Sequence, residues 1–406
     1  MIFRDSHIVM LGCFDTKGED FSYLFQCLKG KEQQIIAINT GVMETAVEFK
    51  IDFDNEAVAA ASGTTLEAIR HSGDRGKAVE LMGKGAAAIL SELTSEKRIK
   101  GVIGMGGGGG TFIALAGMQA VPFGIPKLCL STLAAKDLSR QVGVKDITLM
   151  PSIVDVAGLN SISKLLIQQA AAAICGMVEV DMEVKVDTKK SIAISMFGNT
   201  TECVDKCTKL LKKEGYEVFP FHATGVGGAT MESLIREGCF DAVLDITTTE
   251  LADDLCGGIC SAGPKRLTAA SEMGIPQVVV PGCLDMVNFA HFDTVPEQFK
   301  DRKLYRWAPD VTLMRTNKEE NAILGNRLAS KLNASQAKVE ILLPLKGISQ
   351  IDNKSDIFYD PDVDHVLFEA IKANVEGQIN VVEVDAHIND EKFARTLVAH
   401  LLKLIR

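Results

Sequence analysis

The feature that most constrains the fold of this chain is a repeat within it. Residues 7–41 read "HIVMLGCFDTKGEDFSYLFQCLKGKEQQIIAINTG", and residues 191–225 read "SIAISMFGNTTECVDKCTKLLKKEGYEVFPFHATG". Both segments run from an apolar stretch through a polar turn and an amphipathic stretch to a second apolar stretch, and both end in Thr-Gly. A second echo links "GIPKLCLST" from Gly124 with "GIPQVVVPG" from Gly274. We therefore expect a tandem duplication of a βαβ-based unit.

This repeat predicts the fold class. Apolar stretches that alternate with amphipathic helices, such as residues 77–98, indicate a parallel sheet covered by helices on both faces. We predict an α/β protein with two tandem Rossmann-like domains, each a doubly wound, mainly parallel sheet. The domains are expected at residues 1–180 and 190–406, joined by the charged stretch of residues 179–190. The segment from about residue 338 onward is expected to complete the second sheet.

Composition excludes several classes of protein. With 406 residues, 47% hydrophobic and 24% charged, the chain is ordinary globular material. A net charge of −10 argues against non-specific nucleic-acid binding. The cysteines form no C-x-x-C and the histidines no H-E-x-x-H, so we expect no zinc and a reduced, cytoplasmic protein. No signal peptide or membrane span is expected, because glycine and proline break the uncharged residues 101–126.

A run of consecutive glycines, residues 106–110, stands between a predicted strand and a predicted helix. Ligands of open parallel sheets bind beyond the carboxyl ends of the strands, and the N–H groups of a following helix attract phosphate. The alternative is a tight turn with close helix–sheet packing, which needs one or two glycines rather than the whole run. The motif G-x-x-x-x-G-K-[ST] is missing. The loop resembles the G-G-D-G-T loop of phosphofructokinases, lipid kinases and NAD kinases, but Gly109 stands where they carry aspartate.

Other polar residues of the first copy are expected at the same edge of the sheet. Asp15, Thr16 and Lys17 follow the first strand, where they suit a metal ion or a phosphate, or equally a helix cap. Later strands end near Ser131 and Thr132 and near Asp146, Asp155 and Asn160, with Asp155 equally suited to a buried structural role. The predicted cofactor-binding residues are Asp15, Thr16, Lys17, Gly106, Gly107, Gly108, Gly109, Gly110, Thr111, Ser131 and Thr132.

The second copy carries its own polar cluster at predicted strand ends. His222 and Glu250 are the candidate proton-transferring groups, and the planar guanidinium of Arg266 suits a substrate carboxylate or phosphate. Taken singly, these residues are more often helix caps or solvated helix starts, but together they resemble a polar small-molecule site. The predicted substrate-binding residues are Thr224, Gly225, Gly227, Gly228, Thr247, Thr248, Thr249, Asp285 and Asn288.

The motifs "CFDTKGED", "GMGGGGGT", "DITLMPSIVDVAGLN", "FHATGVGGATME", "DAVLDITTTELAD" and "VTLMRTNKEEN" together resemble one widespread family. It is the largely uncharacterised bacterial, fungal and plant family related to the N-terminal region of the tomato-mosaic-virus resistance protein. The resemblance covers nearly the whole chain and implies two Rossmann-like subdomains, ATP binding in the first and a homodimer. "STLAAKDL" departs from the family pattern S-T-x-A-S-G-D at Ala135 and Lys136, which weakens the expected contact from that loop.

Two functional classes remain open at this point. The first is an enzyme that uses ATP, with Mg²⁺ as a possible companion, on an unidentified small molecule bound by the second copy. The second is a nucleotide-regulated binding protein without catalysis, as in the plant antiviral relative. The cluster of the second copy favours the enzyme, and the missing aspartate at Gly109 favours the binding protein. For the homodimer, the alanine-rich residues 165–178 are a candidate interface helix, although core packing explains them equally well.

Overall fold

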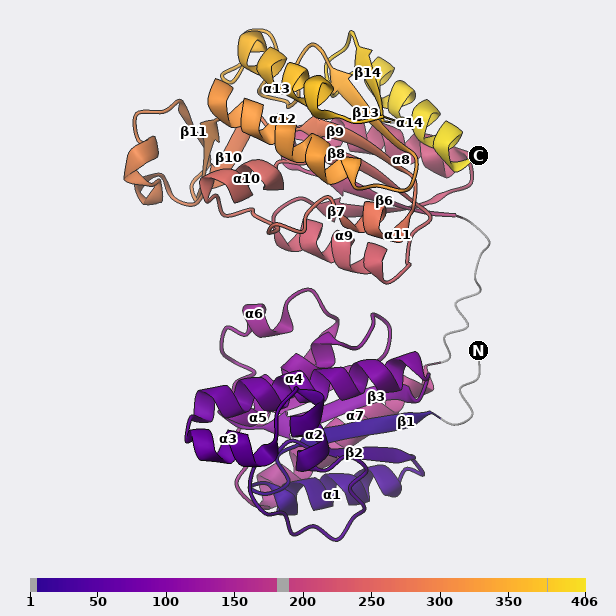
Figure 1. The fold of residues 1–406 in the computed structure, drawn as a ribbon, viewed down its shortest axis with the longest axis vertical. Coiled ribbons are helices and arrows are strands. Elements are labelled where there is room, and N and C mark those ends of the chain that lie inside the picture. Colours follow the sequence, from indigo (N-terminus) through magenta and orange to yellow (C-terminus); the bar gives the residue numbers. More distant parts are fainter. Residues whose placement is uncertain (1–5, 181–189, 378) are drawn as a thin grey trace. The chain divides into compact units, whose positions relative to one another are not determined.

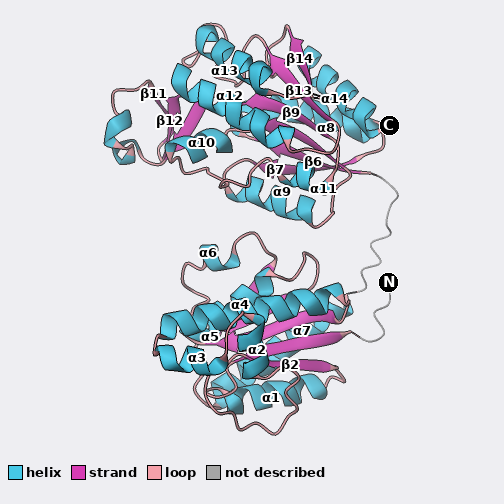
Figure 2. Cartoon of the chain, in the orientation of Figure 1, coloured by secondary structure: helices cyan, strands magenta, loops and turns pink. Residues whose placement is uncertain are grey.

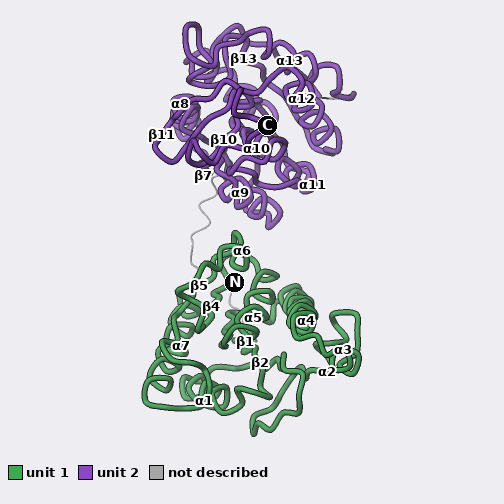
Figure 3. Tube along the Cα trace, turned by 90° about the vertical axis from the view of Figure 1, so that its left-hand side faces the viewer, with its two compact units in different colours: residues 1–185 green, residues 186–406 purple. Residues whose placement is uncertain are grey.

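The protein is described by a computed structural model that covers residues 6–180, 190–377 and 379–406. The chain divides into two compact units, Met1–Lys185 and Val186–Arg406, called unit 1 and unit 2 below (Figure 3). The division falls within the predicted boundary stretch, most of which lies outside the described residues.

Unit 1 is built on a five-stranded sheet of order β2-β1-β3-β4-β5 in which all neighbouring strands are parallel. The strands are β1 (His7–Gly12), β2 (Ile35–Asn39), β3 (Ile99–Gly106), β4 (Lys127–Ser131) and β5 (Ile147–Pro151). One face packs on α1 (Gly18–Lys29) and α7 (Ser161–Glu179), and the other on α4 (Arg75–Ser95) and α5 (Gly108–Gln119) (Figure 1). The shorter helices are α2 (Asn55–Ala61), α3 (Leu66–Ser72) and α6 (Ser139–Val142).

Unit 2 is built on a six-stranded parallel sheet of order β14-β13-β9-β8-β6-β7. The strands are β6 (Ser191–Met196), β7 (Glu217–His222), β8 (Ala242–Thr247), β9 (Gln277–Gly282), β13 (Val339–Pro344) and β14 (Asn380–Val384). Helices α8 (Thr201–Lys213) and α14 (Glu391–Ile405) cover one face. The remaining helices are α9 (Val226–Arg236), α10 (Glu250–Cys256), α11 (Ala269–Met273), α12 (Lys318–Asn333) and α13 (Pro361–Asn374).

A small antiparallel sheet in unit 2 has no counterpart in unit 1 among the described residues. It joins β10 (Met286–Phe289), β12 (Val311–Arg315) and β11 (Leu304–Ala308), in that order (Figure 2). Short 3₁₀ turns lie at η1 (Gly198–Thr200), η2 (Phe292–Thr294) and η3 (Glu297–Phe299). The duplication pattern did not predict this sheet, because its strands fall outside the repeated segments.

The predicted fold class is confirmed. Unit 1 has the order β2-β1-β3-β4-β5, and the first five strands of the parallel sheet of unit 2 repeat it as β7-β6-β8-β9-β13. The strands β13 and β14 complete the second sheet, as the C-terminal segment predicted. Matching orders, together with the aligned segments, support duplication of one parallel unit.

Helix α7 contains the candidate interface residues 165–178. Among the described helices it is the one that is long and apolar enough to cross a membrane, with a mean hydropathy of 1.3. Its inner side chains Ile167, Ala171 and Ile174 are buried in the core of unit 1, whereas Ile162 and Leu165 are exposed. The inner face therefore packs like that of a core helix, and the outer face leaves apolar side chains uncovered.

Candidate functional site

The main cavity of unit 1 lies at the carboxyl edge of its sheet and has a volume of about 1130 Å³. Segments that follow all five strands line it, so it spans the whole edge, the usual ligand position in open α/β sheets. Predicted cofactor-binding residues in its lining are Asp15, Thr16, Lys17, Gly106, Gly107, Gly108, Gly109, Gly110, Ser131 and Thr132. The structure thus brings ten of the predicted residues together around one cavity.

The glycine run forms the start of a helix rather than a loop. Strand β3 ends at Gly106, Gly107 is the extended N-cap, and α5 begins at Gly108, three residues earlier than the sequence pattern indicated. No side chain caps this helix end. The first N–H groups of a helix have no partner within the helix, and the glycines that carry them here line the cavity.

The glycines of the run differ in what requires them. A Cβ atom on Gly106 would lie 2.9 Å from the backbone Cα of Gly110, so packing excludes a side chain there. A Cβ atom on Gly108 would meet nothing within 4 Å. On Gly107 it would lie 3.8 Å from Asp155 Oδ1, which is ordinary contact distance. Close packing therefore accounts for Gly106 but leaves the bare backbone at Gly107 and Gly108 unexplained.

Charged side chains around the cavity are mostly cations. Lys17, Arg75 and Lys136 line it, and none of their side chains makes a hydrogen bond or ion pair within the described chain. The Asp15 carboxylate accepts hydrogen bonds from the backbone N–H groups of Thr16, Val42 and Met43 at 2.7–2.9 Å. It therefore holds the loop that follows β2. Asp155 is exposed, and its carboxylate has no partner among the described residues.

Two of the predicted cofactor-binding residues use their hydroxyl groups in hydrogen bonds within unit 1. Thr111 is fully buried, does not line the cavity, and its hydroxyl lies 3.2 Å from the Gly106 carbonyl and 2.6 Å from the Ser131 hydroxyl. Ser131 lines the cavity but accepts the Leu133 N–H. The Thr111 hydroxyl braces β3 against β4, and a contact of Thr111 with a cofactor stays a prediction. The Asp15 carboxylate does not cap α1, whose N-cap is Lys17 without a side-chain hydrogen bond, and it holds the loop after β2 instead.

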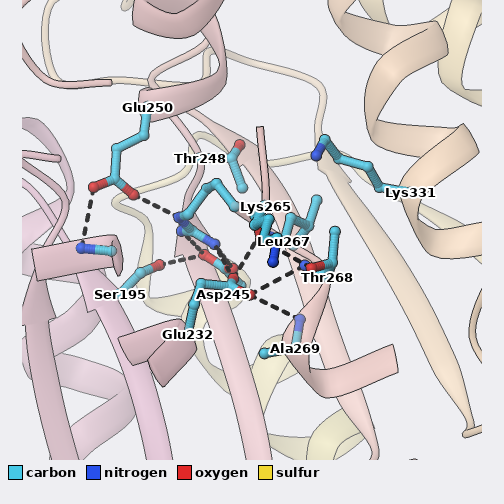
Figure 4. A network of polar contacts seen from close by, with 12 residues as sticks. Ser195, Glu232, Asp245, Thr248, Glu250, Lys265, Leu267, Thr268, Ala269 and Lys331 are labelled. Carbon is cyan, nitrogen blue, oxygen red and sulfur yellow. Dashed lines mark hydrogen bonds and ion pairs between the residues drawn. The ribbon is translucent and has the colours of Figure 1, made fainter. Parts of the chain in front are cut away.

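Unit 2 buries two of its three predicted catalytic groups, Glu250 and Arg266, in an ionic network (Figure 4). The Arg266 guanidinium donates to Asp245 at 2.5 and 2.7 Å, to Glu250 at 2.5 Å and to Glu232 at 3.3 Å. Arg266 is 1% exposed and Glu250 is 0% exposed. Burial acts to lower the pKa of Arg266, but the charges of Asp245 and Glu250 outweigh it and raise that pKa. Burial raises the pKa of Glu250, which Arg266 opposes.

The glycines of the second copy make room for this network. Glu250 accepts the backbone N–H groups of Gly225 at 2.8 Å and Gly228 at 3.1 Å, at the start of α9. A Cβ atom on Gly228 would lie 2.0 Å from the Glu250 carboxylate, and one on Gly227 would lie 1.8 Å from the His222 carbonyl. An acidic side chain of the protein itself thus occupies the helix end that an anionic ligand would need.

A second buried network lies farther along the same edge. Arg315 donates to Asp364 at 2.6 Å and lies 3.8 Å from Asp352, and the Ser349 hydroxyl donates to Asp285 at 2.7 Å. Burial raises the pKa of Asp352 to about 9, reinforced by the charge of Asp285, and burial raises the pKa of Asp285 to about 6. Nearby, Asn288 donates to Asp253, whose pKa burial raises to about 7.

These contacts correct the predicted site of unit 2. Thr247, Thr248, Thr249, Asp285 and Asn288 are at most 1% exposed, whereas His222 and Thr224 lie at the surface. Among the described residues, none of the predicted set lines the unit 1 cavity or the smaller surface cavity of about 640 Å³ beside Trp307. Arg266 pairs with Glu232, Asp245 and Glu250, so these groups form internal structure rather than an open site.

The sequence reasoning missed Arg75 and Lys136 as cavity residues. Arg75 opens helix α4, far in the chain from the glycine run, and Lys136 was noted only as a departure from a family pattern. The sequence signal that could have indicated Arg75 as a cavity residue is a basic residue at the start of a predicted helix. No group of three or more His, Cys, Asp or Glu side chains among the described residues is arranged to hold a metal ion.

Comparison with known proteins identifies the family. The N-terminal domain of the uncharacterised protein family UPF0261 matches residues 6–183, and its C-terminal domain matches residues 189–405. A UPF0261 protein of Clostridium tetani is 44% identical over 399 residues, covering 98% of both chains. The ToMV resistance protein Tm-1(GCR237) of Solanum lycopersicum is 35% identical over 418 residues, which cover 98% of this chain and 55% of the tomato protein.

Solved structures are more distant. The S. aureus MnaA–UDP co-structure is 13% identical with a TM-score of 0.23, covering 92% of this chain and 93% of that one. A UDP-N-acetylglucosamine 2-epimerase is 12% identical with a TM-score of 0.24, covering 98% and 96%. Neither likeness bears on the chemistry of this chain. The family matches, by contrast, cover both units, and the chain belongs to the UPF0261 family.

Proposed function

We propose that unit 1 binds ATP, with the phosphates on the uncapped start of α5. The observation that carries the proposal is the bare backbone at Gly107 and Gly108, which packing does not require and which faces the cavity. Amide groups at a helix start bind phosphate through direct hydrogen bonds and the helix dipole. The ATP assignment itself rests on the family resemblance, which implied a nucleotide in this domain.

The charges of the cavity support a polyanionic ligand. Lys17, Arg75 and Lys136 approach it from separate segments of unit 1, in a chain whose net charge is −10. Asp155 is the one carboxylate in the described lining that no backbone donor neutralises. Free cations around an amide cradle suit an anionic ligand better than a neutral metabolite, and we assign Lys17 and Arg75 to the triphosphate.

The remaining lining supports a place for the base. Val42 and Met43 after β2, and Val79 and Met82 of α4, form an apolar side of the cavity, opposite the loops after β4 and β5. Met43 is 59% exposed, so an apolar surface stands uncovered at this end. A purine packed there would remove apolar area from water.

A magnesium ion fits this arrangement only as a companion of the phosphates. The described residues offer no all-protein cage, and Mg²⁺ is usually held by substrate phosphates, waters and one or two protein oxygens. The Thr132 hydroxyl lies 3.9 Å from the Cβ position of Gly107 and would supply a protein oxygen for its coordination. When bound, the ion would neutralise charge on the phosphates.

Replacing Gly108 by valine tests the proposal. The valine side chain has open space, so unit 1 should fold, but the branched group would cover the amide cradle. We expect at least a hundredfold loss of ATP affinity in calorimetry, with an unchanged circular dichroism spectrum. Gly176→Val is the matched control, because Gly176 is also helical and has nothing within 4 Å of its Cβ position. Equal ATP affinity of both variants and the wild type would return the run to a packing role.

Two uses of the nucleotide are compatible with this proposal: regulation without catalysis, and catalysis within unit 1. Burial of Glu250 and Arg266 speaks against catalysis at the predicted cluster of unit 2 and supports either a non-catalytic, nucleotide-regulated protein or chemistry within unit 1. The homodimer and the cytoplasmic location that the resemblance and composition indicated belong to the same proposal. For the dimer, the exposed Ile162 and Leu165 of α7 offer an apolar contact surface.

A further inference from the structure

The cavity of unit 1 is larger than the proposed nucleotide needs. Its volume of about 1130 Å³ exceeds the roughly 300–1,000 Å³ of typical small-molecule sites. With the base on the side of β2 and α4 and the phosphates at the turn after β3, the nucleotide leaves the loops after β4 and β5 uncovered. That side contains a separate group of polar side chains.

Three of these side chains are free and come from two loops. Thr132 and Lys136 follow β4, and Asp155 follows β5. None of the three makes a side-chain hydrogen bond or ion pair within the described chain. Asp155 Oδ1 lies 3.8 Å and Thr132 Oγ1 lies 3.9 Å from the Cβ position of Gly107, the N-cap of α5. The carboxylate and the hydroxyl therefore flank the place proposed for the terminal phosphate.

We infer that this side is an acceptor subsite for a small hydroxy acid, at which unit 1 transfers a phosphoryl group from the nucleotide. The inference rests on the proposed nucleotide site. The Lys136 ammonium pairs with the carboxylate of the hydroxy acid. The hydroxyl group of the acid faces the terminal phosphate beside Asp155. A lone, flexible cation on a loop suits a small anion that must enter and leave.

The reaction balances with the residues present. The acceptor oxygen forms a bond to the terminal phosphorus, the bond from that phosphorus to the oxygen of the nucleoside diphosphate breaks, and the Asp155 carboxylate takes the hydroxyl proton. The products are a phosphate ester of the acid, the nucleoside diphosphate and one proton. An aspartate that accepts the substrate proton is the usual partner of a positioned phosphoryl donor.

This assignment also accounts for the missing aspartate of the glycine run. Gly109 cannot supply a carboxylate, and the Asp15 carboxylate already accepts three backbone N–H groups. Asp155 reaches the N-cap of α5 from the neighbouring loop instead. The loop holds its position partly through Asp20 of α1, whose Oδ2 accepts the Gly158 N–H at 3.1 Å.

The test uses the full chain with ATP, MgCl₂ and a panel of glycolate, D-glycerate, L-lactate and L-malate, followed by ³¹P NMR. We expect ADP together with a phosphate ester of at least one acid. Asp155→Asn should reduce turnover at least a hundredfold while the calorimetric affinity for ATP changes less than threefold. Lys136→Met should raise the KM of the acid at least tenfold and leave kcat nearly unchanged, whereas Lys84→Met, an exposed site outside the cavity, should change neither.

The outcomes separate the two proposals. If ATP binds but none of the acids is phosphorylated by the wild type, the acceptor subsite is wrong and the nucleotide site stands. Unchanged turnover in Asp155→Asn would equally overturn it. If the wild type does not bind ATP, the failure lies with the proposed function itself.

Discussion

The turn after β3 in unit 1 and the turn after β8 in unit 2 occupy the same place in two sheets of the same strand order, yet they have opposite characters. In unit 1 the turn consists of glycines and faces a cavity. In unit 2 it is Thr247, Thr248, Thr249 and Glu250, all 0% exposed, with Glu250 held by Arg266. One copy leaves an uncapped helix start at the edge of a cavity, and in the other the carboxylate from this turn satisfies the start of α9.

The comparison shows how one duplicated frame serves two purposes. A parallel sheet brings its strand ends together at one edge, and polar residues there either meet a ligand or one another. Unit 2 gathers Glu232, Asp245 and Glu250 around a single arginine, so its polar edge is rigid, closed structure. Unit 1 keeps its cations unpaired, so its edge remains available for binding.

The largest expected effect comes from breaking the closed network. Arg266→Met leaves three buried carboxylates without their cation, and we expect unit 2 to lose roughly 3–5 kcal/mol of unfolding free energy. Urea denaturation followed by Trp307 fluorescence measures this, because Trp307 lies in unit 2 and the chain has one tryptophan. Arg327→Met is the control, since its ion pair with Asp254 is only partly buried and is worth about 1 kcal/mol at most. An equal, small effect of both variants would mean that the network contributes little to stability.

A smaller effect separates two glycines of the open turn. Gly106→Ala forces a Cβ atom to within 2.9 Å of the Gly110 backbone and should destabilise unit 1 by about 1–3 kcal/mol. Gly108→Ala has free space and should leave the stability of unit 1 unchanged or slightly raised, because alanine favours the helix. Thermal unfolding of both variants followed by circular dichroism checks this. Equal destabilisation would show that packing requires the whole run.

Unit 2 should also show a gradual pH dependence of its stability. Asp352 has a folded-state pKa of about 9, above that of an unfolded aspartate, so folding takes up a proton between these values. The stabilising contribution is therefore present at low pH and is lost as pH rises toward 9. Between pH 5 and 8 we expect the unfolding free energy to fall by at most about 1.4 kcal/mol per pH unit from this group.

Asp352→Asn is the matched test of that dependence. The asparagine keeps an oxygen for the Ile348 N–H, which donates to Asp352 at 2.9 Å, and cannot ionise. Urea titrations at several pH values should give a flatter profile for this variant than for the wild type. A wild-type stability that rises between pH 5 and 8, or a variant with the same slope, would contradict the assignment of Asp352.

Much of the fold followed from local pattern. The gapless echo between residues 7–41 and 191–225 predicted two parallel units, and the sheet orders confirm it. The candidate site of unit 1 could also be predicted largely from the sequence. Asp15, Lys17 and the glycine run all follow strands, and the ends of parallel strands meet at one edge of the sheet. Arg75 and Lys136 escaped notice, since nothing local to them indicates which strand end they approach.

The sequence by itself determined which backbone segments meet, because apolar periodicity and glycine placement act through neighbouring residues. Only the tertiary structure decided which polar residues pair with one another. From the sequence alone, the Thr-Thr-Thr-Glu turn and the glycine turn look equally suited to a ligand. Only in three dimensions does Arg266 reach Asp245 and Glu250 across the sheet edge, where burial makes pairing with each other the stable outcome. Lys17, Arg75 and Lys136 find no such partners in the described chain, and their edge stays open.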